Sequence, residues 1–112
     1  MPTALDWLNA FLLTQAVEVP IYVLGLGASV PAAFAASALT HPVVWFGFFS
    51  PAFAAPYSLR LVAAELFAWL AEAAWFAGAV RLPRSRALGW ALVANAASVL
   101  AGLATRALFD WP

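Results

Sequence analysis

The stretch that decides the fold covers residues 19–59, VPIYVLGLGASVPAAFAASALTHPVVWFGFFSPAFAAPYSL, and these 41 residues include no Asp, Glu, Lys or Arg. A helix that rises about 1.5 Å per residue needs roughly 20 residues to cross about 30 Å of hydrocarbon. The run is therefore too long for one membrane span and fits the end of one span followed by a complete second span. Gly25, Gly27, Ser29 and Pro31 predict a tight turn between the two.

The composition of the whole chain agrees with this pattern. Of the 112 residues, 66% are hydrophobic and 9% are charged, and the mean hydropathy is +0.93. A soluble domain of this size is about half apolar and about one quarter charged. The composition therefore excludes a soluble domain and predicts a surface that faces the lipid bilayer. The chain has no cysteine, which excludes disulfides and thiolate metal sites, and its five basic and five acidic residues do not support nucleic-acid binding.

The charge spacing over the rest of the chain predicts an all-α integral membrane protein. We expect a single domain over residues 1–112, with four transmembrane helices in an antiparallel up-down bundle joined by very short loops. Ser58 is the expected N-cap of the third helix. The expected helices cover residues 5–26, 30–49, 59–80 and 85–109.

The arginines predict an orientation for these four helices. Arg81, Arg84 and Arg86 lie in the loop before the fourth helix, whereas the opposite face carries Arg60 and Arg106. The positive-inside rule then predicts that this loop is cytoplasmic and that both termini are outside. The first residues lack the basic segment of a cleaved signal peptide, so we expect the first helix to remain in the mature protein.

Ionisable residues inside the expected spans carry the functional signal. Glu65 lies about 7 Å from the bilayer centre, on the same face of its helix as Glu72. Gln15 and Tyr22 share a face of the first helix with Glu18. Each helix places one polar side chain within about 4 Å of the bilayer centre. These four are Glu18, His41, Glu72 and Asn95.

Three interpretations of this polar layer are open. An ionised group at such a depth costs several kcal/mol, so each carboxyl should be protonated, paired or bound to a cation. The layer is then a proton site, or a site in which Glu18, His41 and Glu72 bind a divalent metal such as zinc. Alternatively it is a purely structural network that pairs Glu18 with His41, Glu72 with Asn95, and Gln15 with Tyr22.

We expect a function in ion- or proton-coupled transport, with Glu18 and Glu72 as the titrating or coordinating groups and His41 as their partner. In this hypothesis Glu65 is an outer access step, while Gln15 and Asn95 orient the carboxyls by hydrogen bonds. A homo-oligomer, or assembly with other membrane subunits, is expected because four short helices enclose little volume.

Two alternatives belong to other classes: an accessory subunit of a larger membrane complex, and a membrane enzyme that acts on a lipid-soluble substrate. The only histidine, His41, lies far from most serines, which argues against a Ser–His hydrolase. A bis-histidine haem would likewise need a second subunit, so a divalent cation is the cofactor that remains under consideration.

In length, number of spans and the presence of Glu18 in the first span, the chain is similar in outline to the small multidrug resistance transporters. These transporters act as dimers that exchange protons for cations, which is what the resemblance implies here. The segment TQAVEVP at residues 14–20 departs from that family's first-helix pattern, and Glu65 and Glu72 are foreign to it. The resemblance is therefore one of architecture, and no residue role follows from it.

Overall fold

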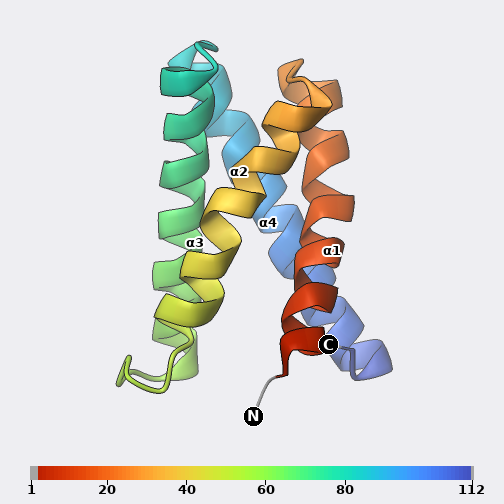
Figure 1. Cartoon of the computed structure of the whole chain (residues 1–112), viewed down its shortest axis with the longest axis vertical. Helices are drawn as coiled ribbons and strands as arrows, with labels where there is room; N and C mark the ends of the chain where they lie inside the picture. Colours follow the sequence, from red (N-terminus) through yellow and green to blue (C-terminus); the bar gives the residue numbers. More distant parts are fainter. Residues whose placement is uncertain (1–2, 112) are drawn as a thin grey trace.

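Residues 3–111 are described by a computed structural model, and within them the chain forms four helices and no strand. Each helix is long and apolar enough to cross a membrane, as the charge spacing predicts. Figure 1 shows successive helices running in opposite directions, with both ends of the chain at the same end of the bundle. We call this the terminal end, and we call the opposite end, which holds the turn before α2 and the loop before α4, the turn end.

The first three helices each change from α-helical to π-helical geometry in their last turn. In the first two, this change begins two residues after a proline, Pro20 or Pro42. The third change, from α3 to η3 at Trp75, occurs without a proline inside α3. The segments are α1 Ala4–Ile21 with η1 Tyr22–Leu26, α2 Val30–Val43 with η2 Val44–Phe48, α3 Tyr57–Ala74 with η3 Trp75–Ala79, and α4 Arg84–Phe109.

Local hydrogen bonds define where the helices begin. At the start of α1, the Thr3 N–H donates to the Asp6 carboxylate (2.7 Å), and the Asp6 N–H donates to the Thr3 hydroxyl (3.1 Å), which is a capping box. Before α2, Gly27 adopts a φ of +74°, which costs glycine nothing, and Ser29 caps the new helix. The predicted tight turn between the first two helices is confirmed.

The predicted N-cap of the third helix, Ser58, is wrong. Helix α3 begins at Tyr57, directly after Pro56, and Ser58 lies inside its first turn instead of capping it. Pro56 has a φ of −59° and its carbonyl accepts the Arg60 N–H at 3.0 Å, so the proline itself provides the entry to the helix.

Small side chains fill many of the contacts between the helices, and many large apolar side chains are exposed on the outside of the bundle. Gly25 shows how close this packing is, since a Cβ atom at that position would lie 2.6 Å from the Trp90 ring. Leu24 and Leu100, in contrast, are 85% and 66% exposed. Alanine allows backbones to approach closely, which is how helices gain contact where lipid replaces water. The buried alanines are Ala28, Ala33, Ala36, Ala64, Ala68, Ala73, Ala87, Ala91 and Ala94.

Candidate functional site

Two carboxyl groups meet inside the bundle. Glu18 of α1 and Glu72 of α3 are each only 1% exposed. The two carboxyl groups are near enough to repel each other if both are ionised. No basic side chain is a hydrogen-bond partner of either glutamate within residues 3–111. Two neighbouring carboxylates without a cation are costly to bury.

Glu18 is held by hydroxyl groups from two other helices. The Ser37 hydroxyl of α2 donates to one carboxyl oxygen, Oε1, at 2.9 Å. The Ser98 hydroxyl of α4 donates to the other oxygen, Oε2, at 2.6 Å. One carboxyl group of α1 therefore connects α1, α2 and α4.

Glu72 has a similar set of donors. Its Oε1 atom accepts hydrogen bonds from the Tyr22 hydroxyl of η1 and from Nδ2 of Asn95 in α4, the latter at 3.2 Å. Its Oε2 atom accepts from the Thr40 hydroxyl of α2 at 2.7 Å. All four oxygens of the two carboxyl groups are thus engaged, and the network includes all four helices.

Of the polar residues predicted to support the site, Asn95 and Tyr22 join this network and Gln15 does not. Asn95 contacts Glu72 as expected, and Tyr22 joins the same carboxyl group. Gln15 is buried, but its amide donates to the Phe34 carbonyl at 3.0 Å instead of pairing with Tyr22. The predicted Gln15–Tyr22 pair is therefore not formed.

His41 lies outside the carboxyl network. Its ring packs among Trp7, Phe11 and Trp45, with centroid distances of 5.8, 5.4 and 6.1 Å. Its Nε2 atom is buried and has no hydrogen-bond partner among the residues described. Thr40, one residue earlier, occupies the position next to Glu72 that the prediction gave to the histidine.

The predicted metal ligands are consequently not brought together. Within residues 3–111, no group of three or more His, Cys, Asp or Glu side chains could hold a metal ion. The reason is helix rotation: successive residues of a helix point about 100° apart, so Thr40 and His41 share a depth but not a face. The position of His41 along its helix predicted that it belongs to the polar layer. Position along the helix does not determine which face of the helix a residue lies on.

Glu65 also lies apart from the pair, in a more apolar setting. It is half-buried and lines a cavity of about 330 Å³ on the α3 and α4 side, together with Trp69, Leu92 and Asn95. No hydrogen bond to its carboxyl group is present in the described part of the chain. Asn95 borders both this cavity and the buried network.

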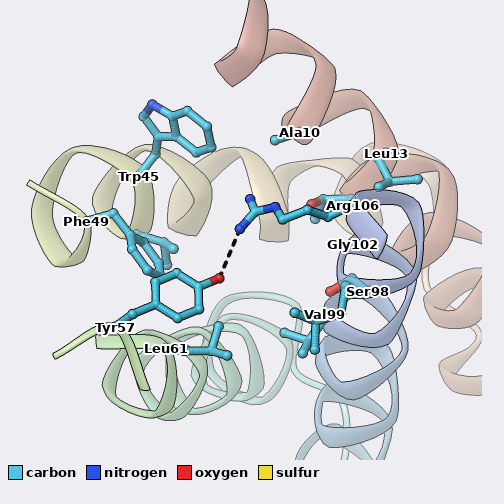
Figure 2. Close-up of a pocket in the computed structure, with 13 residues that line it drawn as sticks. Ala10, Leu13, Trp45, Phe49, Tyr57, Leu61, Ser98, Val99, Gly102 and Arg106 are labelled. Atoms are coloured by element: carbon cyan, nitrogen blue, oxygen red, sulfur yellow. Dashed lines mark hydrogen bonds between the residues drawn. The ribbon is translucent and has the colours of Figure 1, made fainter. Parts of the chain in front are cut away.

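A larger cavity of about 400 Å³ opens at the terminal end, between α1, η2, α3 and α4. Figure 2 shows Trp45, Phe49 and Tyr57 on one side, with Arg106 extending toward the Tyr57 hydroxyl. The Arg106 Nη1 atom donates to that hydroxyl at 3.2 Å. Ser98 lines the cavity and also donates to Glu18, so one hydroxyl group connects the cavity with the carboxyl pair.

Sequence reasoning missed three members of the network: Ser37, Thr40 and Ser98. Ser37 and Thr40 are three residues apart and share one face of α2. Ser98 follows Asn95 at the same spacing on α4. Polar residues at helical spacing within an apolar span are the signal that would have found them.

The chain was compared with protein-family models, with curated proteins and with solved structures, and none of the three comparisons found a match.

Proposed function

We propose that the chain is a small multi-pass membrane protein that binds protons at the Glu18–Glu72 pair and uses this binding in ion- or proton-coupled transport. The observation that supports this most strongly is the burial of two neighbouring carboxyl groups whose hydrogen-bond partners among the described residues include no basic side chain. A group in this environment changes its hydrogen bonds and its charge when it gains or loses a proton. Such a change can be coupled to movement of the helices that hold it.

The donor set favours a proton over a divalent metal ion. Hydroxyl and amide groups already occupy all four carboxyl oxygens, and His41 is turned toward aromatic rings. A metal ion would have to displace these donors and recruit a third strong ligand. A proton shared between Glu18 and Glu72 needs neither change.

The exposed surface supports the placement in a membrane. Large apolar side chains such as Leu24, Leu66 and Leu92 are 85%, 51% and 51% exposed, which suits contact with lipid tails. We further propose that all four helices span the bilayer, with the loop before α4 in the cytoplasm, because Arg81 in that loop and Arg84 and Arg86 in the first turn of α4 outnumber the two arginines at the terminal end. Assembly with a second copy or with other membrane subunits stays a prediction.

Infrared spectroscopy of the protein in lipid nanodiscs tests the proton site directly. Titration with pH should reveal a protonated carboxyl C=O band, and Glu18→Gln or Glu72→Gln should remove or shift it, since the amide keeps the size of the side chain but does not titrate. Asp110→Asn is the matched control, because Asp110 is an exposed carboxyl at the end of α4 and Asn tolerates its left-handed backbone. Unchanged carboxyl bands in both Gln variants would contradict the proposal.

Proton movement in proteoliposomes tests the transport part. A trapped pH-sensitive dye should report a flux driven by a gradient of Na⁺ or K⁺ in the wild-type protein and in the Asp110→Asn control. The Glu18→Gln and Glu72→Gln variants should fall to the level of empty liposomes. A wild-type flux equal to that of empty liposomes with both ions would overturn coupled transport of these ions.

A further inference from the structure

The cavity at the terminal end reaches the carboxyl pair through a single hydroxyl group. Glu18 is 1% exposed and does not line the cavity, but Ser98 lines it and donates to Glu18 Oε2 at 2.6 Å. Ser98 is half-buried, whereas the other side chains that donate to the two glutamates within residues 3–111 are fully buried. These others are Tyr22, Ser37, Thr40 and Asn95. Ser98 is therefore the donor that connects the pair with the terminal end.

The wall of this cavity carries polar groups that suit water. Thr14, Tyr57 and Ser98 add hydroxyl groups to a lining that is otherwise largely apolar, and Figure 2 shows Tyr57 and Ser98 on different helices around the space. A cavity holds water when it has room for it and when two to four polar partners are near. The volume of about 400 Å³ far exceeds the roughly 10–15 Å³ that one water molecule needs. The cavity can therefore hold several water molecules next to hydroxyl groups.

The other surroundings of the pair suit water less well. Toward the turn end, Tyr22 and Phe76 are fully buried, with ring centroids 4.4 Å apart. The smaller cavity on the α3 and α4 side borders the network at Asn95, but its wall is mainly apolar. Leu66 and Leu92 of that wall are each 51% exposed, as expected of side chains that face lipid. The terminal end is therefore the side from which water best reaches the network.

The Ser98 hydroxyl has partners for both protonation states of Glu18. Its Oγ atom lies 2.6 Å from Glu18 Oε2 and 3.1 Å from the Asn95 carbonyl oxygen. When Glu18 is ionised, the hydroxyl donates to the carboxylate. When Glu18 is protonated, the carboxyl group donates to Oγ, and the hydroxyl turns to donate to the Asn95 carbonyl. The serine can thus stay hydrogen-bonded while Glu18 gains or loses a proton.

We propose that the cavity holds water that is continuous with the aqueous phase at the terminal end, and that Ser98 relays protons between this water and Glu18. A hydronium ion gives a proton to Oγ and becomes water, while the original hydroxyl proton moves to Glu18 Oε2. The serine is unchanged at the end of this step. The relay rests on the proposed function, because it requires Glu18 to change protonation, whereas water in the cavity does not.

Cysteine labelling tests for water in the cavity, and the chain has no cysteine of its own. Thr14→Cys places a thiol in the cavity wall, and Gly102→Cys is a second reporter in case the first variant does not fold. Leu12→Cys is the control, because Leu12 is on the same helix, is 54% exposed and does not line the cavity. In phosphatidylcholine nanodiscs, a charged methanethiosulfonate should modify Thr14→Cys at least about tenfold faster than Leu12→Cys, since it reacts with the thiolate, which forms in water. Equal rates, or no reaction at either cavity position, would overturn the water-filled cavity.

Exchange of the carboxyl proton for deuterium tests the relay. Infrared spectra after transfer to D₂O follow the protonated carboxyl band that Glu18→Gln removes. Ser98→Ala should slow its exchange at least about tenfold, because a positioned proton-transfer group is lost, and Ser98→Thr should restore it. Ser37→Ala is the matched control, since it also removes one hydroxyl donor to Glu18, but from a side chain that is 0% exposed and outside the cavity. It should slow the exchange much less, whereas a purely structural role predicts equal effects.

A bulky side chain in the cavity links the two measurements. Gly102→Trp should slow both the labelling of Thr14→Cys and the carboxyl exchange several-fold, since a Cβ atom at Gly102 meets no neighbour within 4 Å and the ring has room to enter the cavity. Leu100→Trp, on the same helix, is the control, because Leu100 is 66% exposed and outside the cavity. Rapid exchange in the Gly102→Trp variant would overturn the proposed route.

The remaining outcomes separate this inference from the proposed function. Unchanged exchange in Ser98→Ala, equal slowing in Ser37→Ala, or no recovery in Ser98→Thr would overturn the relay and leave the proton site intact. If no protonated carboxyl band is found at any pH, the proposed function fails and the relay fails with it. Labelling of the cavity thiol does not depend on titration, so it still decides whether the cavity holds water.

Discussion

The two ends of the bundle are packed differently. At the turn end, Tyr22 and Phe76 are fully buried with ring centroids 4.4 Å apart, and Gly25 lies against the ring of Trp90. At the terminal end, aromatic side chains surround a cavity instead of filling the space between the helices. The carboxyl pair lies between these regions and borders the cavity through Ser98. Apolar residues alone therefore do not give close packing between helices. Close packing also requires that small residues of one helix lie opposite large residues of another.

Two glutamates of α3, Glu72 and Glu65, also differ in how well their surroundings satisfy them. Glu72 accepts hydrogen bonds from three side chains, whereas no hydrogen bond to Glu65, seven residues earlier, is found among the described residues. The two carboxyls share a helix face but not an environment. Substitutions at paired positions, one closely packed or hydrogen-bonded and one not, test whether these differences in packing and hydrogen bonding determine the free energy of unfolding.

The largest effect is expected at the carboxyl pair. Glu72→Ala leaves Tyr22, Thr40 and Asn95 without their common acceptor, and at about 1 kcal/mol for each hydrogen bond this costs about 3 kcal/mol of unfolding free energy. Glu65→Ala should cost less than about 1 kcal/mol. Unfolding in mixed micelles with increasing dodecyl sulfate measures both, and equal costs would contradict the distinction between the two sites.

A glycine at each end provides the next test. Gly25→Ala places a Cβ atom 2.6 Å from the Trp90 ring, and such overpacking costs about 1–3 kcal/mol. Gly102→Ala has no neighbour within 4 Å and should stay within about 0.5 kcal/mol of the wild type. Thermal unfolding in detergent should rank the two variants in this order. A larger loss at Gly102 would mean that the terminal end is also closely packed.

The two tyrosines allow a smaller and sharper comparison. Tyr22→Phe removes a buried donor to Glu72 and should cost about 1 kcal/mol. Tyr57→Phe removes a half-exposed hydroxyl at the mouth of the cavity and should change stability by less than about 0.5 kcal/mol. The same micelle assay measures this pair. A cost at Tyr57 as large as at Tyr22 would argue that its contact with Arg106 holds the terminal end together.

His41 should show the smallest effect of all. Its Nε2 atom is buried without a hydrogen-bond partner in the described structure, and its ring packs against Trp7 and Phe11. His41→Phe keeps the aromatic packing and removes the unpaired nitrogen, so we expect a change within about 0.5 kcal/mol, or a gain in stability. Carboxyl infrared bands identical to those of the wild type should accompany it. A shift of those bands would restore the predicted link between His41 and the glutamates.

Much of the molecule follows from the sequence because length and charge spacing are properties of the chain itself. Runs without charge predicted four helices, and the turn at Gly27 and Ser29 formed where expected. The rise per residue placed Glu18, Glu72 and Asn95 at similar depths, and these three do lie in one buried network.

Tertiary structure decided which of the residues at that depth face one another. Rotation of α2 about its axis brought Thr40 to Glu72 and turned His41 toward the rings of α1. Packing of four helices likewise brought Ser37 and Ser98, 61 positions apart in the sequence, to the two oxygens of Glu18. By itself the sequence determined how many apolar helices form and how far along its helix each polar group lies, because both depend on spacing along one helix. The facing side chains and the cavity depend on how neighbouring helix surfaces fit together, which only the folded bundle determines.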